Sequence, residues 1–151
     1  MKRIALVAAL LLLAGCGQET SALPGNGVVV DCSSIATVKT QNKSALLKCL
    51  DGNSTVNVGQ IKGPVLVNVW GSWCTSCLAE MPEFVSFYSK AKGKVQLVGV
   101  AVEEAAPANS QRFIVKHGMT WPNFYDRENK TRGYFGMGVP VTWFIDAAGE
   151  V

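Results

Sequence analysis

The residues with the clearest chemical potential are the cysteines, of which this 151-residue chain has five. Cys74 and Cys77 are separated by two small polar residues and lie between an apolar run and a helical pattern. Such a pair can be a redox couple, half of a metal site or two inert thiols. A zinc site needs a second set of ligands at comparable spacing. The other cysteines and the single histidine, His117, are scattered, so the redox couple is the favoured interpretation.

The expected position of the pair at a helix start indicates how it would react. Unpaired backbone N–H groups and the positive end of the helix dipole stabilise a thiolate there. We therefore predict that Cys74 is the nucleophile, because the thiolate is the reactive form of cysteine. Cys77 follows one turn later and can resolve a mixed disulfide by forming the intramolecular bond. The flanking Trp73 and the Thr75-Ser76 pair indicate an exposed loop rather than a core.

The first residues have the pattern of an export signal. Lys2 and Arg3 precede a ten-residue apolar run, which is too short to span a bilayer but suits a signal peptide. The run leads into LAGC, residues 13–16, which resembles the bacterial lipobox, where cleavage precedes a cysteine whose thiol is diacylated. We expect residues 1–15 to be a lipoprotein signal peptide and Cys16 to be lipidated. An ordinary secretory signal is the alternative.

The next segment, residues 16–27, is expected to be a flexible tether, because it is polar, rich in glycine and without periodicity. Together with the signal, it predicts a protein that is lipid-anchored on the outer face of the bacterial cytoplasmic membrane.

The remaining cysteines are expected to form two disulfides. Lipidation of Cys16 leaves four cysteines in an oxidising compartment, and the sequence alone allows three connectivities. Cys74 and Cys77 are close enough to pair locally, which leaves Cys32 with Cys49. We interpret Cys32–Cys49 as a structural disulfide.

The body of the chain alternates between strand and helix patterns. The segment 46–70 is predicted as strand, turn, strand. Further predicted strands are 95–102, 123–125 and 139–145, and predicted helices run from the cysteine pair to 92–93, over 107–117 and over 128–135. The valine-rich run 65–70 predicts a strand covered on both faces, and the alternation predicts βαβ units with a central parallel sheet. Pro82 is expected to kink the first helix.

We divide this body into an N-terminal extension, residues 28–50, and a domain, residues 51–151. The extension holds Cys32 and Cys49 and contributes to a hairpin. The domain stops directly after the turn at 146–149. An edge strand and a final covering helix are expected next and are apparently missing, so the domain is interpreted as C-terminally truncated, with a partly uncovered sheet as the alternative.

Two stretches carry a resemblance to a known family. VLVNVWGSWCTSCLAEMPEF, residues 65–84, resembles the active-site strand and helix of the TlpA/ResA/CcmG (DsbE)-type extracytoplasmic thioredoxins. GVPVTWFID, residues 138–146, is similar to their second signature, in which the proline is cis. The resemblance implies a thioredoxin-like α/β fold with a central mixed sheet flanked by helices.

The resemblance also implies roles for individual residues. A cis Val139–Pro140 bond would present the backbone of Val139 opposite the cysteine pair, where an extended substrate can pair with it. Trp73 is expected to shield the sulfurs. Glu80, one helical turn after Cys77, is expected to exchange protons with that thiol.

The sequence also departs from related proteins. Many thioredoxins have a buried aspartate as proton acceptor where this chain has Asn68. Its absence strengthens the expectation that Glu80 exchanges the proton. The Thr75-Ser76 dipeptide lacks the proline that is common before the second cysteine in these families, so their redox potential cannot be assigned to this cysteine pair. Glu103 directly follows the predicted strand 95–102, and we assign it no role.

The sequence therefore predicts a membrane-anchored thiol–disulfide oxidoreductase that needs no cofactor and no metal. We expect a reductase of the cytochrome c maturation type, with cysteine-containing exported proteins such as apocytochrome c as clients and a membrane thiol–disulfide carrier as electron donor. The alternatives are a disulfide-forming oxidase and a non-catalytic metal-handling module of the same fold. The net charge is +3, and Lys2 and Arg3 contribute two of these charges. The remaining charge is too small to predict binding to nucleic acid. His117 is expected to cap a helix C-terminus as a cation.

Overall fold

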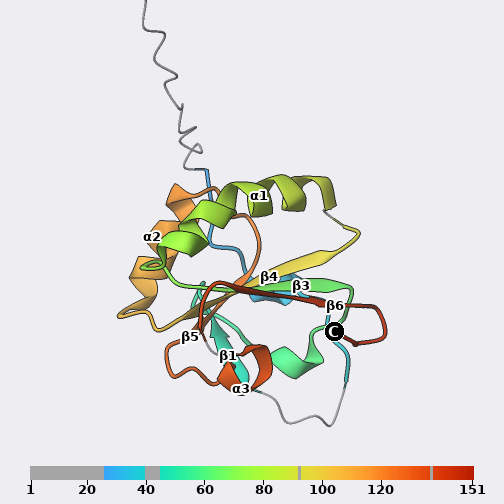
Figure 1. Cartoon of the computed structure of the whole chain (residues 1–151). Helices are drawn as coiled ribbons and strands as arrows, with labels where there is room; N and C mark the ends of the chain where they lie inside the picture. Colours follow the sequence, from blue (N-terminus) through green and yellow to red (C-terminus); the bar gives the residue numbers. More distant parts are fainter. Residues whose placement is uncertain (1–25, 40–44, 92, 137) are drawn as a thin grey trace, which may run out of the picture.

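A six-stranded sheet organises the chain (Figure 1). The computed structural model describes residues 26–39, 45–91, 93–136 and 138–151. The strand order is β2-β1-β5-β4-β3-β6, with the bounds β1 Leu46–Cys49, β2 Thr55–Asn57, β3 Val65–Trp70, β4 Gln96–Val102, β5 Asn123–Asp126 and β6 Val141–Ile145. The predicted signal peptide, the predicted lipidation site Cys16 and most of the predicted tether lie outside the described residues.

The sheet is mixed rather than purely parallel. β3, β4 and β5 are parallel neighbours, whereas β6 runs antiparallel beside β3 and β1 runs antiparallel beside β5. Parallel neighbours need a crossover connection, and here the crossovers are helices. α1, Thr75–Ala91, joins β3 to β4, and α2, Pro107–Lys116, joins β4 to β5. The mixed sheet implied by the family resemblance is therefore confirmed, and the parallel sheet inferred from alternation alone holds only for these three strands.

The two crossover helices cover one face of the sheet (Figure 1). Both connections step in the same direction along the sheet, and right-handed crossovers in one direction bring their helices to the same side. α3, Arg132–Phe135, and the 3-10 turn η2, Val58–Gln60, lie on the opposite side.

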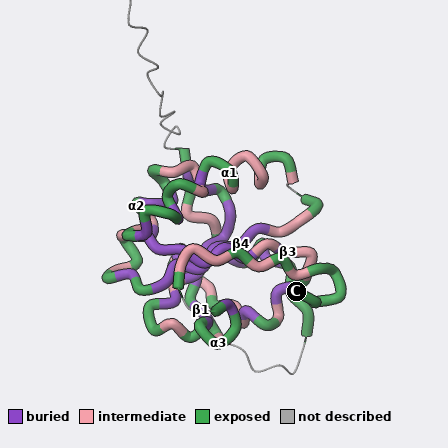
Figure 2. The backbone as a smooth tube through the Cα atoms, viewed as in Figure 1, coloured by how far each residue is buried: buried purple, intermediate pink, exposed green. Residues whose placement is uncertain are grey.

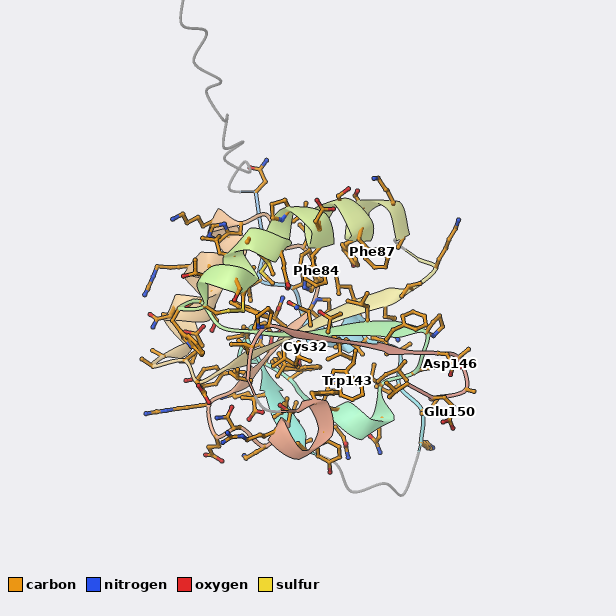
Figure 3. The ribbon with its side chains drawn as sticks, in the orientation of Figure 1. Cys32, Phe84, Phe87, Trp143, Asp146 and Glu150 are labelled. Carbon is orange, nitrogen blue, oxygen red and sulfur yellow. A yellow bond between two sulfur atoms is a disulfide. The ribbon has the colours of Figure 1, made fainter. Side chains whose placement is uncertain are left out.

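Each face of the sheet buries its own hydrophobic cluster. Val67 and Val69 of β3 belong to the cluster on the α3 side, whereas Trp70 belongs to the cluster beneath α1 and α2. Phe84 and Phe87 of α1 point from the helix toward the sheet, and both pack against this second cluster (Figure 3). The central strands β3, β4 and β5 form the most buried layer of the molecule (Figure 2). The prediction that β3 is covered on both faces is confirmed.

Residues 26–39, which we call the N-terminal strap, are attached to this body. The Gly27 N–H donates to the Val115 carbonyl of α2 at 3.1 Å, and Val30 forms a β-bridge with Pro122. The strap then enters the 3-10 turn η1, Cys32–Ser34. Gly27, the last residue of the predicted tether, thus already belongs to the folded body.

The β1–β2 hairpin crosses the domain boundary that we predicted between residues 50 and 51. β1 pairs antiparallel with β2 on one side and with β5 on the other. The backbone groups of β1 therefore complete the sheet beside β5, and the predicted extension is an integral part of one sheet.

The short helix before the last strand begins later than predicted. One carboxylate oxygen of Asp126 accepts the Lys130 N–H at 2.8 Å, and the other accepts the N–H and hydroxyl of Thr131 at 2.8 and 2.6 Å. These hydrogen bonds hold the intervening residues in a turn, so α3 starts only at Arg132.

His117 is the C-terminal cap of α2, as predicted, but the lowered pKa of its side chain does not favour the cation that the prediction assumed. Its backbone N–H donates to the Phe113 carbonyl at 3.0 Å, and its ring lies on that of Phe113 with 4.3 Å between centroids. Burial, and then the charge of Lys116, lower the pKa of His117 below its ordinary value. This favours the neutral imidazole. Gly118 follows with φ +72°, a conformation that glycine adopts readily at helix ends.

Candidate active site

Cys74 occupies the capping position at the start of α1. β3 ends at Trp70, and a turn in which the Cys74 N–H donates to the Gly71 carbonyl at 3.1 Å leads into the helix. The Cys74 carbonyl accepts the Leu78 N–H at 3.1 Å, and its sulfur accepts the Cys77 N–H at 3.1 Å. A side chain that accepts the N–H of the third helical residue is a typical helix cap. The sulfur of Cys74 therefore lies where negative charge is stabilised.

Cys74 and Cys77 are joined by a disulfide with an S–S distance of 2.14 Å and a Cα–Cα distance of 5.3 Å. Cys74 is 6% exposed and Cys77 is fully buried at 0%. Thiol–disulfide exchange requires that the incoming thiolate reach one sulfur. Cys74 is the sulfur closer to solvent, and Cys77 lies behind it. The loop residues Thr75 and Ser76 are exposed as predicted, but the sulfurs themselves are buried.

Trp73 lies largely at the surface of the molecule. It is 54% exposed, and its indole lies against Gly71, where an added Cβ would stand 2.7 Å from the Trp73 Nε1. Glycine at position 71 thus makes room for the ring. The predicted shielding role of Trp73 stays a prediction.

A small pocket lies beside this loop. Trp73 and Val139 line it together with Glu103, Arg132 and Phe135. Val139 also packs against both hydrophobic clusters, one of which contains the Cys74–Cys77 disulfide. The fold therefore brings two of the three residues predicted to bind substrate to one surface hollow.

Pro140 follows Val139 through a cis peptide bond and is half-buried. It leads directly into β6, in which Val141 pairs with Val69 at the end of β3. Since the cysteine loop follows β3, the Val139–Pro140 segment lies at the same end of the sheet as the disulfide.

For Glu80 and Asn68, the structure shows no hydrogen bond to the sulfurs within the described residues. Glu80 lies on α1 one turn after Cys77 and is half-buried, and within the described residues its carboxylate has no hydrogen bond or ion pair. Its proton exchange with Cys77 stays a prediction. Asn68 is fully buried in β3, where its amide donates to the Thr142 hydroxyl at 3.3 Å.

The buried carboxylate of the site is Glu104, which the sequence analysis missed. It is 2% exposed and accepts two hydrogen bonds from Ser72, one from the backbone N–H and one from the hydroxyl at 2.8 Å. Ser72 stands two residues before Cys74, so Glu104 fixes the entry of the cysteine loop. The available signal was the Glu103-Glu104 pair at the end of a buried parallel strand. The cysteine loop begins at the same edge of the sheet. We noted only Glu103, which is exposed and accepts from the Asn129 amide at 2.7 Å.

The other two cysteines of the folded body form a second disulfide, remote from this site. Cys32 and Cys49 are joined with an S–S distance of 2.02 Å and a Cα–Cα distance of 6.0 Å, and both are buried. They belong to the cluster on the α3 side of the sheet, whereas Cys74 and Cys77 belong to the other. This bond attaches the N-terminal strap to β1.

The residues that the structure describes contain neither a cluster of metal ligands nor a membrane-spanning helix. No group of three or more histidine, cysteine, aspartate or glutamate side chains there is arranged to hold a metal ion. No helix there is long and apolar enough to cross a membrane.

Solved structures with the same fold include thiol–disulfide proteins. A disulfide oxidoreductase secreted by Mycobacterium tuberculosis matches with a TM-score of 0.63 and 23% identity, over 70% of this chain and 78% of that chain. StoA from Bacillus subtilis matches with a TM-score of 0.57 and 27% identity, over 70% and 81%. A DsbF homologue from Corynebacterium diphtheriae matches with a TM-score of 0.60 and 26% identity, over 81% and 78%. The fold is thioredoxin-like.

Several curated relatives are thiol-disulfide oxidoreductases named ResA. The thiol-disulfide oxidoreductase ResA of Oceanobacillus iheyensis is 33% identical over 101 residues, which cover 65% of this chain and 52% of that protein. ResA of Geobacillus thermodenitrificans is 35% identical over 89 residues, 58% of this chain and 51% of that protein. The chain spans about half the length of these relatives. Residues 38–151, well over half of the chain, match the AhpC/TSA family, and the chain belongs to that family.

Proposed function

We propose that the protein is a thiol–disulfide oxidoreductase that exchanges disulfides with cysteine-containing exported proteins through Cys74 and Cys77. The observation that carries the proposal is the disulfide at the helix start, with Cys74 nearer to solvent and Cys77 buried behind it. This arrangement separates the roles that exchange requires, a sulfur nearer to solvent for the client and an inner sulfur for resolution. The name shared by the ResA relatives supports the same activity.

In the reducing direction the pair begins as a dithiol. The Cys74 thiolate attacks one sulfur of a client disulfide, so a Cys74–client bond forms as the client bond breaks and the first client thiolate leaves. Cys77 then loses its proton, for which Glu80 is the proposed acceptor, and attacks Cys74. The Cys74–Cys77 bond forms, and the second client thiolate leaves. The client has gained two electrons, and a dithiol carrier restores the reduced pair.

We further propose that the protein works on the outer face of the bacterial cytoplasmic membrane, anchored through lipid on Cys16. The LAGC sequence at residues 13–16 supports this location, and the attachment of the strap at Gly27 leaves a short link between the anchor and the body. Apocytochrome c and a membrane thiol–disulfide carrier are the proposed partners of a reductase of the cytochrome c maturation type.

A trapping experiment tests the exchange itself. The full chain carrying Cys77→Ala is expressed in a bacterium that processes lipoproteins, and mixed disulfides are collected and identified by mass spectrometry. Cys77→Ala should accumulate client adducts on Cys74, because the resolving thiol is absent. Cys74→Ala is the matched control and should accumulate far fewer. Equal yields from the two variants would refute the assigned roles.

The potential of the pair tests the direction. A value near −270 mV, as in thioredoxin, supports a reductase, and a value near −120 mV supports an oxidase. Stoichiometric binding of copper or zinc without any disulfide exchange would replace both with the metal-handling alternative.

A further inference from the structure

The N-terminal strap joins the body beside the end of α2. The Gly27 N–H donates to the Val115 carbonyl at 3.1 Å, and the Val28 N–H donates to the Met119 carbonyl at 2.9 Å. Position 27 has no room for a side chain, because an added Cβ would collide with the Ile114 carbonyl oxygen. The chain therefore enters the folded body at a fixed point, on the side of the sheet that α1 and α2 cover (Figure 1).

The surface at this point combines apolar and basic side chains. Val28 is 58% exposed and Val115 is 44% exposed. Arg112 and Lys116 are exposed too, and they share one face of α2 with Val115, because helical residues three and four positions apart are neighbours. We call Val28, Arg112, Val115 and Lys116 the entry face.

The positive charge of the entry face has no local compensation. α2 contains no aspartate or glutamate, so Arg112 and Lys116 give the helix a net charge of +2. Neither of them forms an ion pair within the part of the chain that the structure describes. The acidic residue of the strap, Asp31, lies three positions after Val28, and its carboxylate accepts the Ser33 N–H. Exposed apolar side chains with uncompensated positive charge are complementary to an anionic membrane surface.

The predicted lipid anchor is close to the entry face along the chain. Ten residues, 17–26, separate Cys16 from Gly27. A flexible chain of that length spans about 18 Å on average, whereas a folded body of this size has a diameter of about 35 Å. A lipid on Cys16 would therefore hold the entry face nearer to the bilayer than the α3 side of the sheet. This proximity would raise the effective concentration for weak contacts with lipid.

We propose that the entry face docks on an anionic lipid surface, so that α2 lies against the membrane and the α3 side of the sheet points away from it. Val28 and Val115 then contact the headgroup region, while Arg112 and Lys116 approach the lipid phosphates. This inference rests on the proposed anchoring through Cys16 and adds the orientation of the protein on the membrane.

The test compares the labelling of lysines on two kinds of vesicle. The full chain is purified with its lipid from a bacterium that processes lipoproteins. It is inserted into preformed vesicles of phosphatidylcholine alone, or of equal parts of phosphatidylcholine and phosphatidylglycerol, and acetylation of its lysines is followed by mass spectrometry. Lys116 should be acetylated at least about fivefold more slowly on the anionic vesicles, because each basic residue close to an anionic surface strengthens binding by about that factor.

Lys130 is the matched control within the same molecule. It directly precedes the N-cap of α3, on the opposite side of the sheet, and its side chain is 52% exposed. Its acetylation rate should agree within about twofold on the two vesicles, because salt screens the surface charge over about 10 Å.

Two variants separate the entry face from the rest of the surface. Arg112→Gln combined with Val115→Gln should abolish the slower acetylation of Lys116, because it removes one charge and one apolar side chain from the face. Lys130→Gln removes an equal charge from the opposite side and should leave the effect unchanged.

The possible outcomes distinguish this inference from the anchoring. Equal acetylation of Lys116 on the two vesicles, in a chain that partitions with both, overturns the inference and leaves the anchoring intact. Protection that follows the protein density on the vesicle instead of the lipid charge also overturns it and assigns the entry face to a second copy of the chain. A chain that partitions with neither vesicle overturns the anchoring through Cys16, and this inference with it.

Discussion

Replacing Cys32 and Cys49 together by alanine should lower the free energy of unfolding by about 3 kcal/mol. The disulfide joins residues 17 positions apart. In the chain-entropy description, closing a loop of that size removes about 10.5 cal/mol/K from the unfolded chain, which corresponds to about 3 kcal/mol at 25 °C. Both sulfurs are buried, so lost packing adds to this figure rather than offsetting it.

The measurement is urea unfolding of the wild type and the double variant, with the Cys74–Cys77 disulfide kept oxidised in both. The matched control is Cys74→Ala with Cys77→Ala, which opens a loop with a separation of only three residues. The same relation gives about half the loss for that control, because loop entropy grows with length. A loss below about 1 kcal/mol for the Cys32 and Cys49 variant, or a larger loss for the control, would refute this account of the strap.

Two further predictions concern single side chains. Because burial and then Lys116 lower the pKa of His117, the folded state binds a proton there less readily than the unfolded chain. Its contribution to stability is therefore complete at neutral pH and is lost as the pH falls below about 6.5. An NMR titration of this single histidine should give a pKa below 6.5, and Lys116→Met should raise that pKa. A pKa above 6.5 would contradict the structure. Glu104→Ala should lower the free energy of unfolding, measured with urea, by about 2 kcal/mol, because it leaves two donors of Ser72 unpaired. Glu103→Ala at the exposed neighbour should lower it by less than about 0.5 kcal/mol. Equal losses would show that the Ser72 hydrogen bonds contribute little.

The central unit of the fold could be predicted because its signals are local. The valine-rich strand β3, the period of α1 and the glycine that ends α2 are each contained in a few consecutive residues. The pairing of β1 with β5 could not be predicted, since it joins Lys48 to Tyr125 and depends on the assembled sheet. For the same reason the predicted domain boundary fell inside a hairpin.

In the candidate site, too, the features with local sequence signals were predicted and those that depend on distant contacts were not. The positions of Cys74 and Cys77 followed from their spacing and from the helix after them. Glu104 was missed because its partner, Ser72, is 32 residues away in the sequence, and only the sheet brings the two strand ends together. The lowered pKa of the half-buried His117 likewise depends on partial burial and on Lys116 rather than on its place at a helix end.

The placement of the two disulfides on opposite faces of the sheet has a consequence for the durability of the protein. Exchange between two sulfur pairs requires direct contact of a thiolate with the other disulfide. Here a layer of hydrogen-bonded strands separates the pairs, with Cys32 and Cys49 in one cluster and Cys74 and Cys77 in the other. A freshly reduced Cys77 therefore has no route to Cys49 while the sheet is intact. One chain can thus carry a permanent cross-link and the bond that we propose breaks in every reaction cycle, without scrambling between them.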